Sequence, residues 1–245
     1  MARKETSTAP TGAKLRSPPR NQLRPRRRST AETGARSAVV ATARRMSELR
    51  LSPGRSGNVS VRHEGGMLIT PSGVAYVDLA DGDIVFVASD GTCPGGQRKP
   101  SSEWQFHLAA LAARPDRNAV VHCHSPAAVV LACRHEPIPA FHYMVAVAGG
   151  RDIPCVPYAI FGSDDLARHV ADGLRHRDAC LMANHGQTAI GVDLASALEL
   201  AGEVETLAAQ YVEVLKLGGP KLLSDGEMDE VLEKFKTYGQ RAQAL

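Results

Sequence analysis

The chain has no run of 18 consecutive apolar residues, and its first 30 residues lack the apolar stretch of a secretory signal. We therefore expect neither a membrane-spanning helix nor secretion by that route. Cysteine is scarce: five residues stand far apart, without the paired spacings of a disulfide framework or the CxxC pairs of a zinc ribbon. Reduced thiols in a cytoplasmic protein are the expectation. The sequence also contains no internal repeat.

The charge is distributed unevenly along the 245 residues. Residues 1–36 contain ten Lys and Arg against two acids, a balance of +8, whereas residues 37–245 carry a balance of −5. Residues 1–30 are rich in Ser, Thr, Pro and Arg, and such a segment cannot bury enough apolar surface to offset its ordering entropy. We expect a disordered basic arm over 1–30 and one domain over 31–245.

The arginine run at 24–28 admits three interpretations. It is a nonspecific nucleic-acid or anion-binding arm, an Arg-rich transit peptide, or a solvated tail without function. We expect no nucleic-acid partner beyond weak, nonspecific binding by this arm, and no membrane partner.

Periodicity and Pro/Gly punctuation predict the secondary structure of the body. Helices are predicted over 31–49, 101–114 with a Ser N-cap, 126–133, 164–174, 194–217 and 225–238. Strands are predicted over 58–62, 67–70, 84–87, 119–124, 179–183 and 188–190, and residues 91–100 are expected to form a long turn with a hairpin return. Because strands and helices do not alternate strictly, a mixed or antiparallel sheet covered by helices is favoured over a parallel one.

A His-Cys-His sequence lies on the strand predicted over 119–124. Side chains alternate across a strand, so His122 and His124 share one face, about 7 Å apart, and can converge on one ion. His185, followed by a glycine that suggests a tight turn, is a third candidate. Three neutral imidazoles with open positions are a ligand set of catalytic zinc. The alternative is a pair of partly buried, hydrogen-bonded histidines.

Polar residues upstream add two further features. Glu103 could reach the same ion or act as a base, or it could only offset the dipole of a helix whose first turn it occupies. The segments 56–60 and 70–73 are either simple turns or, together with the helix start at Ser101 and Ser102, a phosphate site.

In this order the motifs resemble the class II aldolase/adducin family. They are Gly57-Asn58-Val59-Ser60, Thr70-Pro71-Ser72-Gly73, Pro100-Ser101-Ser102-Glu103-Trp104, His122-Cys123-His124, His142-Tyr143-Met144 with Gly149-Gly150, and Asn184-His185-Gly186. The resemblance runs from about Met46 to the C-terminus and leaves the basic arm uncovered. Two positions depart from the family pattern. Ser72 stands where Thr is common and Gln187 where an aliphatic residue is usual, and both could alter substrate fit.

The resemblance implies a three-layer α/β fold with a central, largely antiparallel sheet flanked by helices. It also implies a fourfold-symmetric homotetramer with active sites at the subunit interfaces. By the same resemblance, Zn²⁺ is held by His122, His124 and His185, with Glu103 near the metal as the acid/base. The residues implied to hold the substrate phosphate are Gly57, Asn58, Ser72, Gly73, Ser101 and Ser102. The tyrosines implied to reach the site of a neighbouring subunit are Tyr143 and Tyr238.

The implied activity is that of a lyase in fucose degradation. A zinc-dependent aldolase of this kind cleaves L-fuculose 1-phosphate, or a related ketose 1-phosphate, reversibly to dihydroxyacetone phosphate and L-lactaldehyde. Zinc would serve as the Lewis acid and Glu103 would move the proton, so that no lysine Schiff base is needed.

Other activities of the family remain as alternatives: a 4-epimerase, a dehydratase or a sugar-acid phosphate decarboxylase. Glu103 argues against the epimerases, which tend to carry Asp there, and the 235–238 tail favours the fuculose type. A non-catalytic, adducin-like binding protein would be expected to have lost zinc ligands, and all three are kept here.

Overall fold

The computed structural model describes residues 29–237. Tyr238 and residues 1–28 of the expected arm lie outside the described residues. The first described element is α1 (Thr30–Glu48), whose N-cap Ser29 accepts a hydrogen bond from the backbone of Glu32. None of the described helices is long and apolar enough to cross a membrane. All five cysteines are free.

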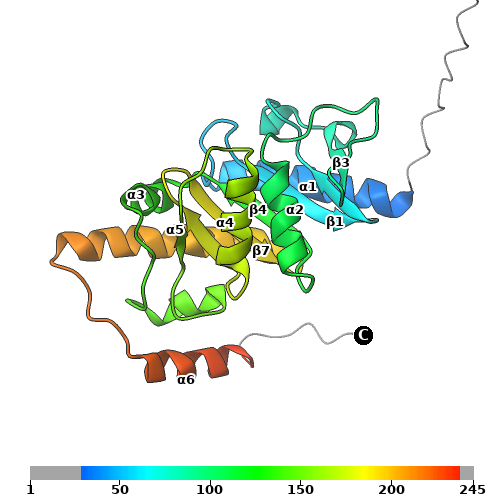
Figure 1. The fold of residues 1–245 in the computed structure, drawn as a ribbon. Helices are drawn as coiled ribbons and strands as arrows, with labels where there is room; N and C mark the ends of the chain where they lie inside the picture. Colours follow the sequence, from blue (N-terminus) through cyan, green and yellow to red (C-terminus); the bar gives the residue numbers. More distant parts are fainter. Residues whose placement is uncertain (1–28, 238–245) are drawn as a thin grey trace, which may run out of the picture.

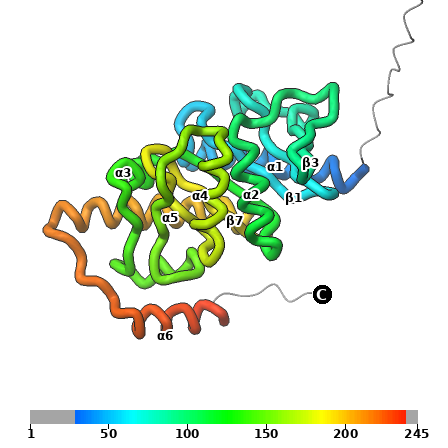
Figure 2. Tube along the Cα trace, viewed as in Figure 1, coloured from blue at the N-terminus to red at the C-terminus, as the bar shows by residue number. Residues whose placement is uncertain are grey.

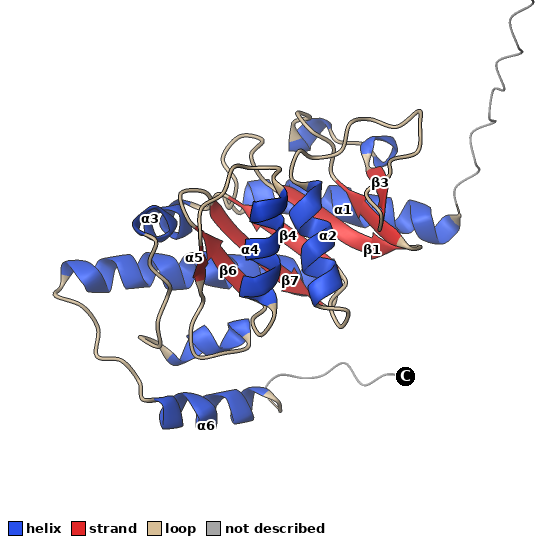
Figure 3. Ribbon diagram, viewed as in Figure 1, coloured by secondary structure: helices blue, strands red, loops and turns tan. Residues whose placement is uncertain are grey.

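One seven-stranded sheet forms the centre of the molecule (Figure 3). Its strands are β1 (Asn58–His63), β2 (Gly66–Ile69), β3 (Val85–Ala88), β4 (Ala119–Cys123), β5 (Cys155–Val156), β6 (Ala179–Met182) and β7 (Gly186–Gly191). The strand order is β3-β2-β1-β4-β7-β6-β5, and every pair is antiparallel except β5 with β6. The expected largely antiparallel sheet is confirmed.

Helices cover both faces of this sheet (Figure 1). The remaining helices are α2 (Trp104–Ala113), α3 (Pro126–Arg134), α4 (Asp164–Leu174), α5 (Leu194–Lys216) and α6 (Asp225–Phe235), with three short 3-10 helices at Tyr76–Asp78, Asp81–Asp83 and Tyr143–Ala148. The apolar side chains of α2 and α4 pack on one face, and those of α1, α3 and α5 pack on the other. The three-layer fold is therefore confirmed. Helix α6 lies apart from the sheet, as the trace in Figure 2 shows, and packs against the 3-10 helix at Tyr143–Ala148.

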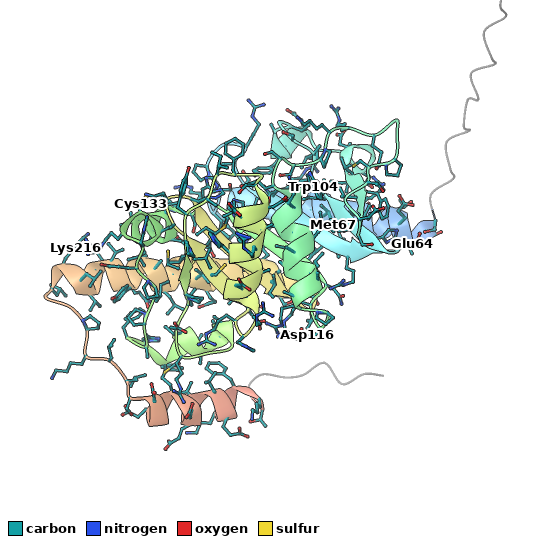
Figure 4. The ribbon with its side chains drawn as sticks, in the orientation of Figure 1. Glu64, Met67, Trp104, Asp116, Cys133 and Lys216 are labelled. Atoms are coloured by element: carbon teal, nitrogen blue, oxygen red, sulfur yellow. The ribbon has the colours of Figure 1, made fainter. Side chains whose placement is uncertain are left out.

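Alternation along β4 decides which way the histidines point. Val120 belongs to the cluster under α2 and α4, while Ala119 and Val121 belong to the cluster on the opposite face. His122, two residues after Val120, therefore faces α2 and meets the ring of Phe106 edge-on, with centroids 5.2 Å apart. Met67 of β2 and Trp104 at the start of α2, both labelled in Figure 4, pack in the same layer.

The strands of the sheet differ from the sequence-based expectation in two places. Residues 91–100 form no strand; the segment returns to the sheet through a single bridge between Pro71 and Pro100. Strand β5 was not expected, because it is two residues long and lies between Pro154 and Pro157, so its pattern is too short to recognise.

A buried arginine attaches α1 to the segment before β3. The guanidinium of Arg36 pairs with Glu32 at 2.8 Å and donates to the carbonyl of Ile84, and the Arg36 side chain is only 3% exposed. The similar pair Arg45–Glu48 on the same helix is largely solvent-exposed. The two ion pairs have similar sequence spacing, but only the pair of Arg36 with Glu32 is buried.

Arg36→Ala is expected to lower the free energy of unfolding by roughly 3 kcal/mol, because it removes the buried ion pair with Glu32 and the hydrogen bond to the carbonyl of Ile84. Arg45→Ala, the control, is expected to cost less than about 1 kcal/mol. Urea denaturation of both variants measures the difference. Equal losses would contradict the proposed attachment.

Candidate metal centre and substrate cavity

Three histidines meet at one end of the central strands. His122 lies on β4, His124 directly follows β4, and His185 lies in the turn between β6 and β7. Their nearest ring nitrogens all lie within 4.8 Å of one another, and the Nε2 atoms of His122 and His124 are 3.1 Å apart. The structure therefore brings together the three imidazoles that the sequence pattern singled out.

Two glycines allow this convergence. A β-carbon at Gly57 would lie 2.6 Å from the carbonyl oxygen of His122, and one at Gly186 would lie 2.5 Å from the carbonyl oxygen of Cys123. Both distances are too short for any side chain. Glycine at these positions lets the segments on either side of β4 approach the His-Cys-His backbone closely.

The turn that carries His185 is attached to the end of α3. Asn184 adopts the left-handed conformation with φ of 53°, and its N–H donates to the carbonyl of Ala132 at 3.0 Å. The side chain of Asn184 also contacts the ring of His135 through its Oδ1 atom, 2.6 Å from Nε2. These contacts fix the turn, and with it the direction of the His185 ring.

Glu103 is the N-cap residue of α2 and makes no side-chain capping bond. The expected Ser N-cap is therefore wrong: the hydroxyl of Ser101 accepts the Glu103 N–H at 3.3 Å, and the helix begins after it. The Glu103 carboxylate lies 3.0 Å from Nε2 of His185 and 3.4 Å from Nε2 of His122. It faces the imidazoles, so compensation of the helix dipole does not account for its position.

The two oxygens of this carboxylate are in different surroundings. Oε2 accepts a hydrogen bond from Nδ2 of Asn58 at 2.8 Å. Oε1 is buried, and no described residue offers it a hydrogen bond of normal geometry. Burial of a carboxylate oxygen that accepts no hydrogen bond costs free energy unless a cation binds that oxygen.

Burial sets the protonation of the cluster. It lowers the pKa of His122 to about 3 and also lowers the pKa of His124. Burial raises the pKa of Glu103, but the neighbouring His122 and His185 and the amide of Asn58 outweigh it and hold this pKa below its usual range. At neutral pH the site therefore offers the uncharged imidazoles of His122 and His124 beside an ionised carboxylate.

This donor set fits a divalent transition metal. Nδ1 of His122 contacts the carbonyl of Gln187 at 2.8 Å, which fixes the proton on Nδ1 and leaves the Nε2 lone pair facing the other two histidines. Crowded lone pairs repel one another unless a cation lies between them. Three imidazoles with a nearby carboxylate are the type of set that binds zinc.

A cavity of about 340 Å³ opens beside the cluster. Its wall includes His124, His185 and Glu103, and all of the residues expected to bind phosphate: Gly57, Asn58, Ser72, Gly73, Ser101 and Ser102. The loops that carry them are joined by backbone hydrogen bonds from Ser72 to Lys99 and from Ser101 to Thr70. The motifs that looked like separate turns in the sequence thus form one continuous rim.

Sequence reasoning missed an arginine and two aromatic side chains of this cavity. Arg55 lines it and donates to the carbonyl of Gly73 at 2.9 Å, while Tyr158 and Phe161 form an aromatic part of the wall. Both aromatic side chains are more than half exposed, at 55% and 61%. No local motif marks Arg55. The aromatic residues of 158–161, which precede a glycine, could have been recognised as an unusually apolar loop.

Comparison with known proteins agrees with this geometry. The profile of the "Class II Aldolase and Adducin N-terminal domain" matches residues 37–212. The chain belongs to the class II aldolase and adducin family. The expected family is therefore confirmed.

Relatives with related names share most of the chain. A 5-methylthioribulose-1-phosphate/5-deoxyribulose-1-phosphate aldolase of Rhodospirillum rubrum is 52% identical over 208 residues, covering 85% of this chain and 94% of that protein. An L-fuculose phosphate aldolase of Escherichia coli O157:H7 is 50% identical over 204 residues, covering 83% and 94%. A solved L-fuculose 1-phosphate aldolase has a TM-score of 0.80 at 38% identity, covering 83% and 96%. These likenesses also confirm the expectation of an enzyme of the aldolase class.

The side chains of two residues that were expected to affect the site do not face the cavity. The side chain of Gln187 donates to Ser125 Oγ and to the carbonyl of Ala201, so it points into the core and not toward a substrate. Tyr143 is half exposed and lies beside Val231 and Phe235 of α6, away from the cavity of its own chain. Its expected contact with a neighbouring site stays a prediction.

The purified class II aldolase is expected to bind one divalent transition-metal ion per chain, and His185→Ala is expected to lose most of it, because one of three imidazole ligands is removed. His176→Ala, which changes an exposed histidine, is the control and should keep its metal. Elemental analysis after gel filtration measures the content. Equal metal loss in both variants would contradict the assignment.

Proposed function

We propose that the protein is a zinc-dependent aldolase that cleaves L-fuculose 1-phosphate, or a related ketose 1-phosphate, reversibly to dihydroxyacetone phosphate and an aldehyde, L-lactaldehyde for the fuculose substrate. The observation that carries the proposal is the position of Glu103. Its carboxylate faces His122 and His185 and lines the same cavity as His124 and His185, with Oε1 buried 3.0 Å from Nε2 of His185. A metal and a proton-transfer group thus adjoin the same space.

The rim of the cavity suits a phosphate monoester. Hydroxyl groups and backbone N–H groups of the glycine- and serine-containing loops are neutral donors of the kind that surround phosphate. Arg55 adds a cation to this rim, where its guanidinium is already placed by the carbonyl of Gly73. The phosphate is therefore placed at the rim, and the sugar carbons extend toward the histidines.

The aromatic wall favours a substrate with an apolar end. L-fuculose 1-phosphate ends in a methyl group, which Tyr158 and Phe161 can cover. The relatives' names include 5-deoxyribulose and 5-methylthioribulose phosphates, whose ends are apolar as well. A ketose 1-phosphate with a deoxygenated end is the substrate class that we propose, with L-fuculose 1-phosphate as its principal member.

The chemistry needs one proton to move. Cleavage of the bond between C3 and C4 transfers a proton from the C4 hydroxyl to C3, and a single carboxylate that takes up the proton and returns it balances the reaction. Glu103 is the one carboxylate among the described residues that line the cavity, and it starts in the ionised form. A bound zinc ion supplies Lewis-acid stabilisation of the negative charge that develops during this cleavage. No lysine is among the described cavity residues, so a Schiff base has no support.

The proposal also includes an oligomeric state and a cellular location. A fourfold homotetramer would bring Tyr143 and Tyr238 of a neighbouring subunit to the aldehyde end of the substrate. The exposure of Tyr143, away from its own cavity, supports such a contact. We place the enzyme in the cytoplasm, in fucose degradation, with the basic arm limited to weak polyanion binding.

Release of dihydroxyacetone phosphate from a panel of sugar phosphates tests the function. L-fuculose 1-phosphate is expected to give the highest kcat/KM, 5-deoxyribulose and 5-methylthioribulose 1-phosphates lower values, and L-ribulose 5-phosphate none, because its phosphate is at the opposite end. Chelation should abolish release, and zinc should restore it. Epimerisation of L-ribulose 5-phosphate without any cleavage by the metal-loaded protein would refute the proposal.

Glu103→Gln is expected to lower kcat by about 10² to 10⁴-fold, because the amide keeps the size of the side chain but cannot take up a proton. At saturating zinc the ion should still be bound through His122, His124 and His185, and the fold should be unchanged. Asp165→Asn is the control: this exposed acid lies in the first turn of α4, so it tests the helix dipole without a catalytic site. Near-normal kcat in a zinc-loaded Glu103→Gln enzyme would exclude Glu103 as the acid/base.

A further inference from the structure

A fully buried histidine lies behind the candidate metal centre, and the proposed reaction does not use it. His107, one turn along α2 from Glu103, has no exposed surface. Its ring stacks on Phe106 with centroids 4.7 Å apart. Both of its ring nitrogens have polar partners on β1: Nδ1 lies 2.7 Å from Oγ of Ser60, and Nε2 lies 2.5 Å from Oδ1 of Asn58.

Acceptor chemistry fixes the direction of each hydrogen bond in the series that links Ser60, His107, Asn58 and Glu103. The Glu103 carboxylate only accepts, so Asn58 presents its Nδ2 hydrogen to it, at 2.8 Å. The amide oxygen of Asn58 therefore faces His107, and because that oxygen also accepts, the imidazole proton is on Nε2. Nδ1 is left as an acceptor, which the hydroxyl of Ser60 serves. All donors point from Ser60 toward Glu103.

We propose that His107 is a positioning residue, which holds the Asn58 amide so that it binds Oε2 of Glu103 and leaves Oε1 for the metal centre. This inference rests on the proposed function, in which Glu103 acts beside the metal. Without the Nε2 donor, the Asn58 amide is free to turn its oxygen toward the carboxylate, and two acceptors repel each other at that distance. The Glu103 side chain would then lose its fixed orientation.

Two further observations agree with this role. The imidazole is neutral, since complete burial lowers the pKa of His107 to about 3, and a neutral ring can donate from one nitrogen while accepting at the other. Asn58 also lines the cavity, so the same amide adjoins both the carboxylate and the space for substrate. Groups that orient a residue at a metal centre commonly change metal affinity or activity by 10- to 100-fold when removed.

A matched pair of variants separates the hydrogen bond from packing. His107→Leu and His107→Gln both lose the ring that stacks on Phe106, but the Gln amide can place an N–H near the position of Nε2. His107→Leu is expected to raise the Zn²⁺ dissociation constant about tenfold and to lower kcat about tenfold. His107→Gln should recover most of both losses. Zinc affinity is measured by competition with a chromophoric chelator, and the fold by circular dichroism.

A double-mutant cycle tests whether His107 acts through Asn58. If it does, adding His107→Leu to Asn58→Ala changes the zinc dissociation constant and kcat by less than about twofold, because the amide that His107 holds is already absent. Additive effects would overturn the proposal, as would equal losses in the Leu and Gln variants, since both outcomes describe a histidine that only fills the core.

Ser60→Ala keeps the inference testable if His107→Leu fails to fold. It removes the donor to Nδ1, frees the imidazole to change tautomer, and is expected to weaken zinc binding in the same direction. Unchanged zinc affinity in Ser60→Ala would then overturn the proposal. Absence of ketose phosphate cleavage by the wild-type protein would refute the proposed function alone, because the zinc dissociation constants of the variants still decide the role of His107.

Discussion

Three imidazole nitrogens and a carboxylate oxygen are held close together at the wall of the cavity, and the surrounding structure depends on this arrangement. Lone pairs that face one another repel, so the backbone must hold them in place. β4 does so from the middle of the sheet, with β1 on one side and β7 on the other. Glycines 57 and 186 permit the close approach, and the end of α3 fixes the turn at His185. The donors are thus held by the end of β4, by a hydrogen-bonded turn and by the start of α2, and not by flexible loops.

Much of the fold could be predicted because its signals are local. The helix expected over 164–174 matches α4 residue for residue, since two first-turn acids and an apolar stripe lie within its eleven residues and a Ser cap directly precedes them. The strands predicted over 58–62 and 67–70 likewise correspond to β1 and β2, which pair as a hairpin. Strand β5 could not be predicted, because a two-residue parallel pairing with β6 arises from tertiary packing and leaves no period to detect.

Some residues of the site could likewise be predicted from local signals, and others could not. The period of two along β4 was enough to place His122 and His124 together. His185 and Glu103 were only candidates on local grounds, and the family resemblance was needed to join them to this pair. His107 looked like an ordinary polar residue on a mostly apolar helix, since its partners Asn58 and Ser60 lie nearly fifty residues earlier. Arg55 was missed for a related reason: its contact with Gly73 crosses between two loops, and neither loop has a pattern that requires a cation. Long-range polar pairing is what the sequence alone does not reveal.

The order of the donors along the chain also governs when the centre can exist during synthesis. Glu103 and the His-Cys-His segment leave the ribosome long before His185, and β4 cannot complete its pairing until β7 has been made. A nascent chain therefore presents scattered histidines with little affinity for a cation, and acquires its centre only as the last strand joins the sheet. An ion bound at this centre would therefore be loaded after folding, and it would tie the end of β4 to the turn between β6 and β7.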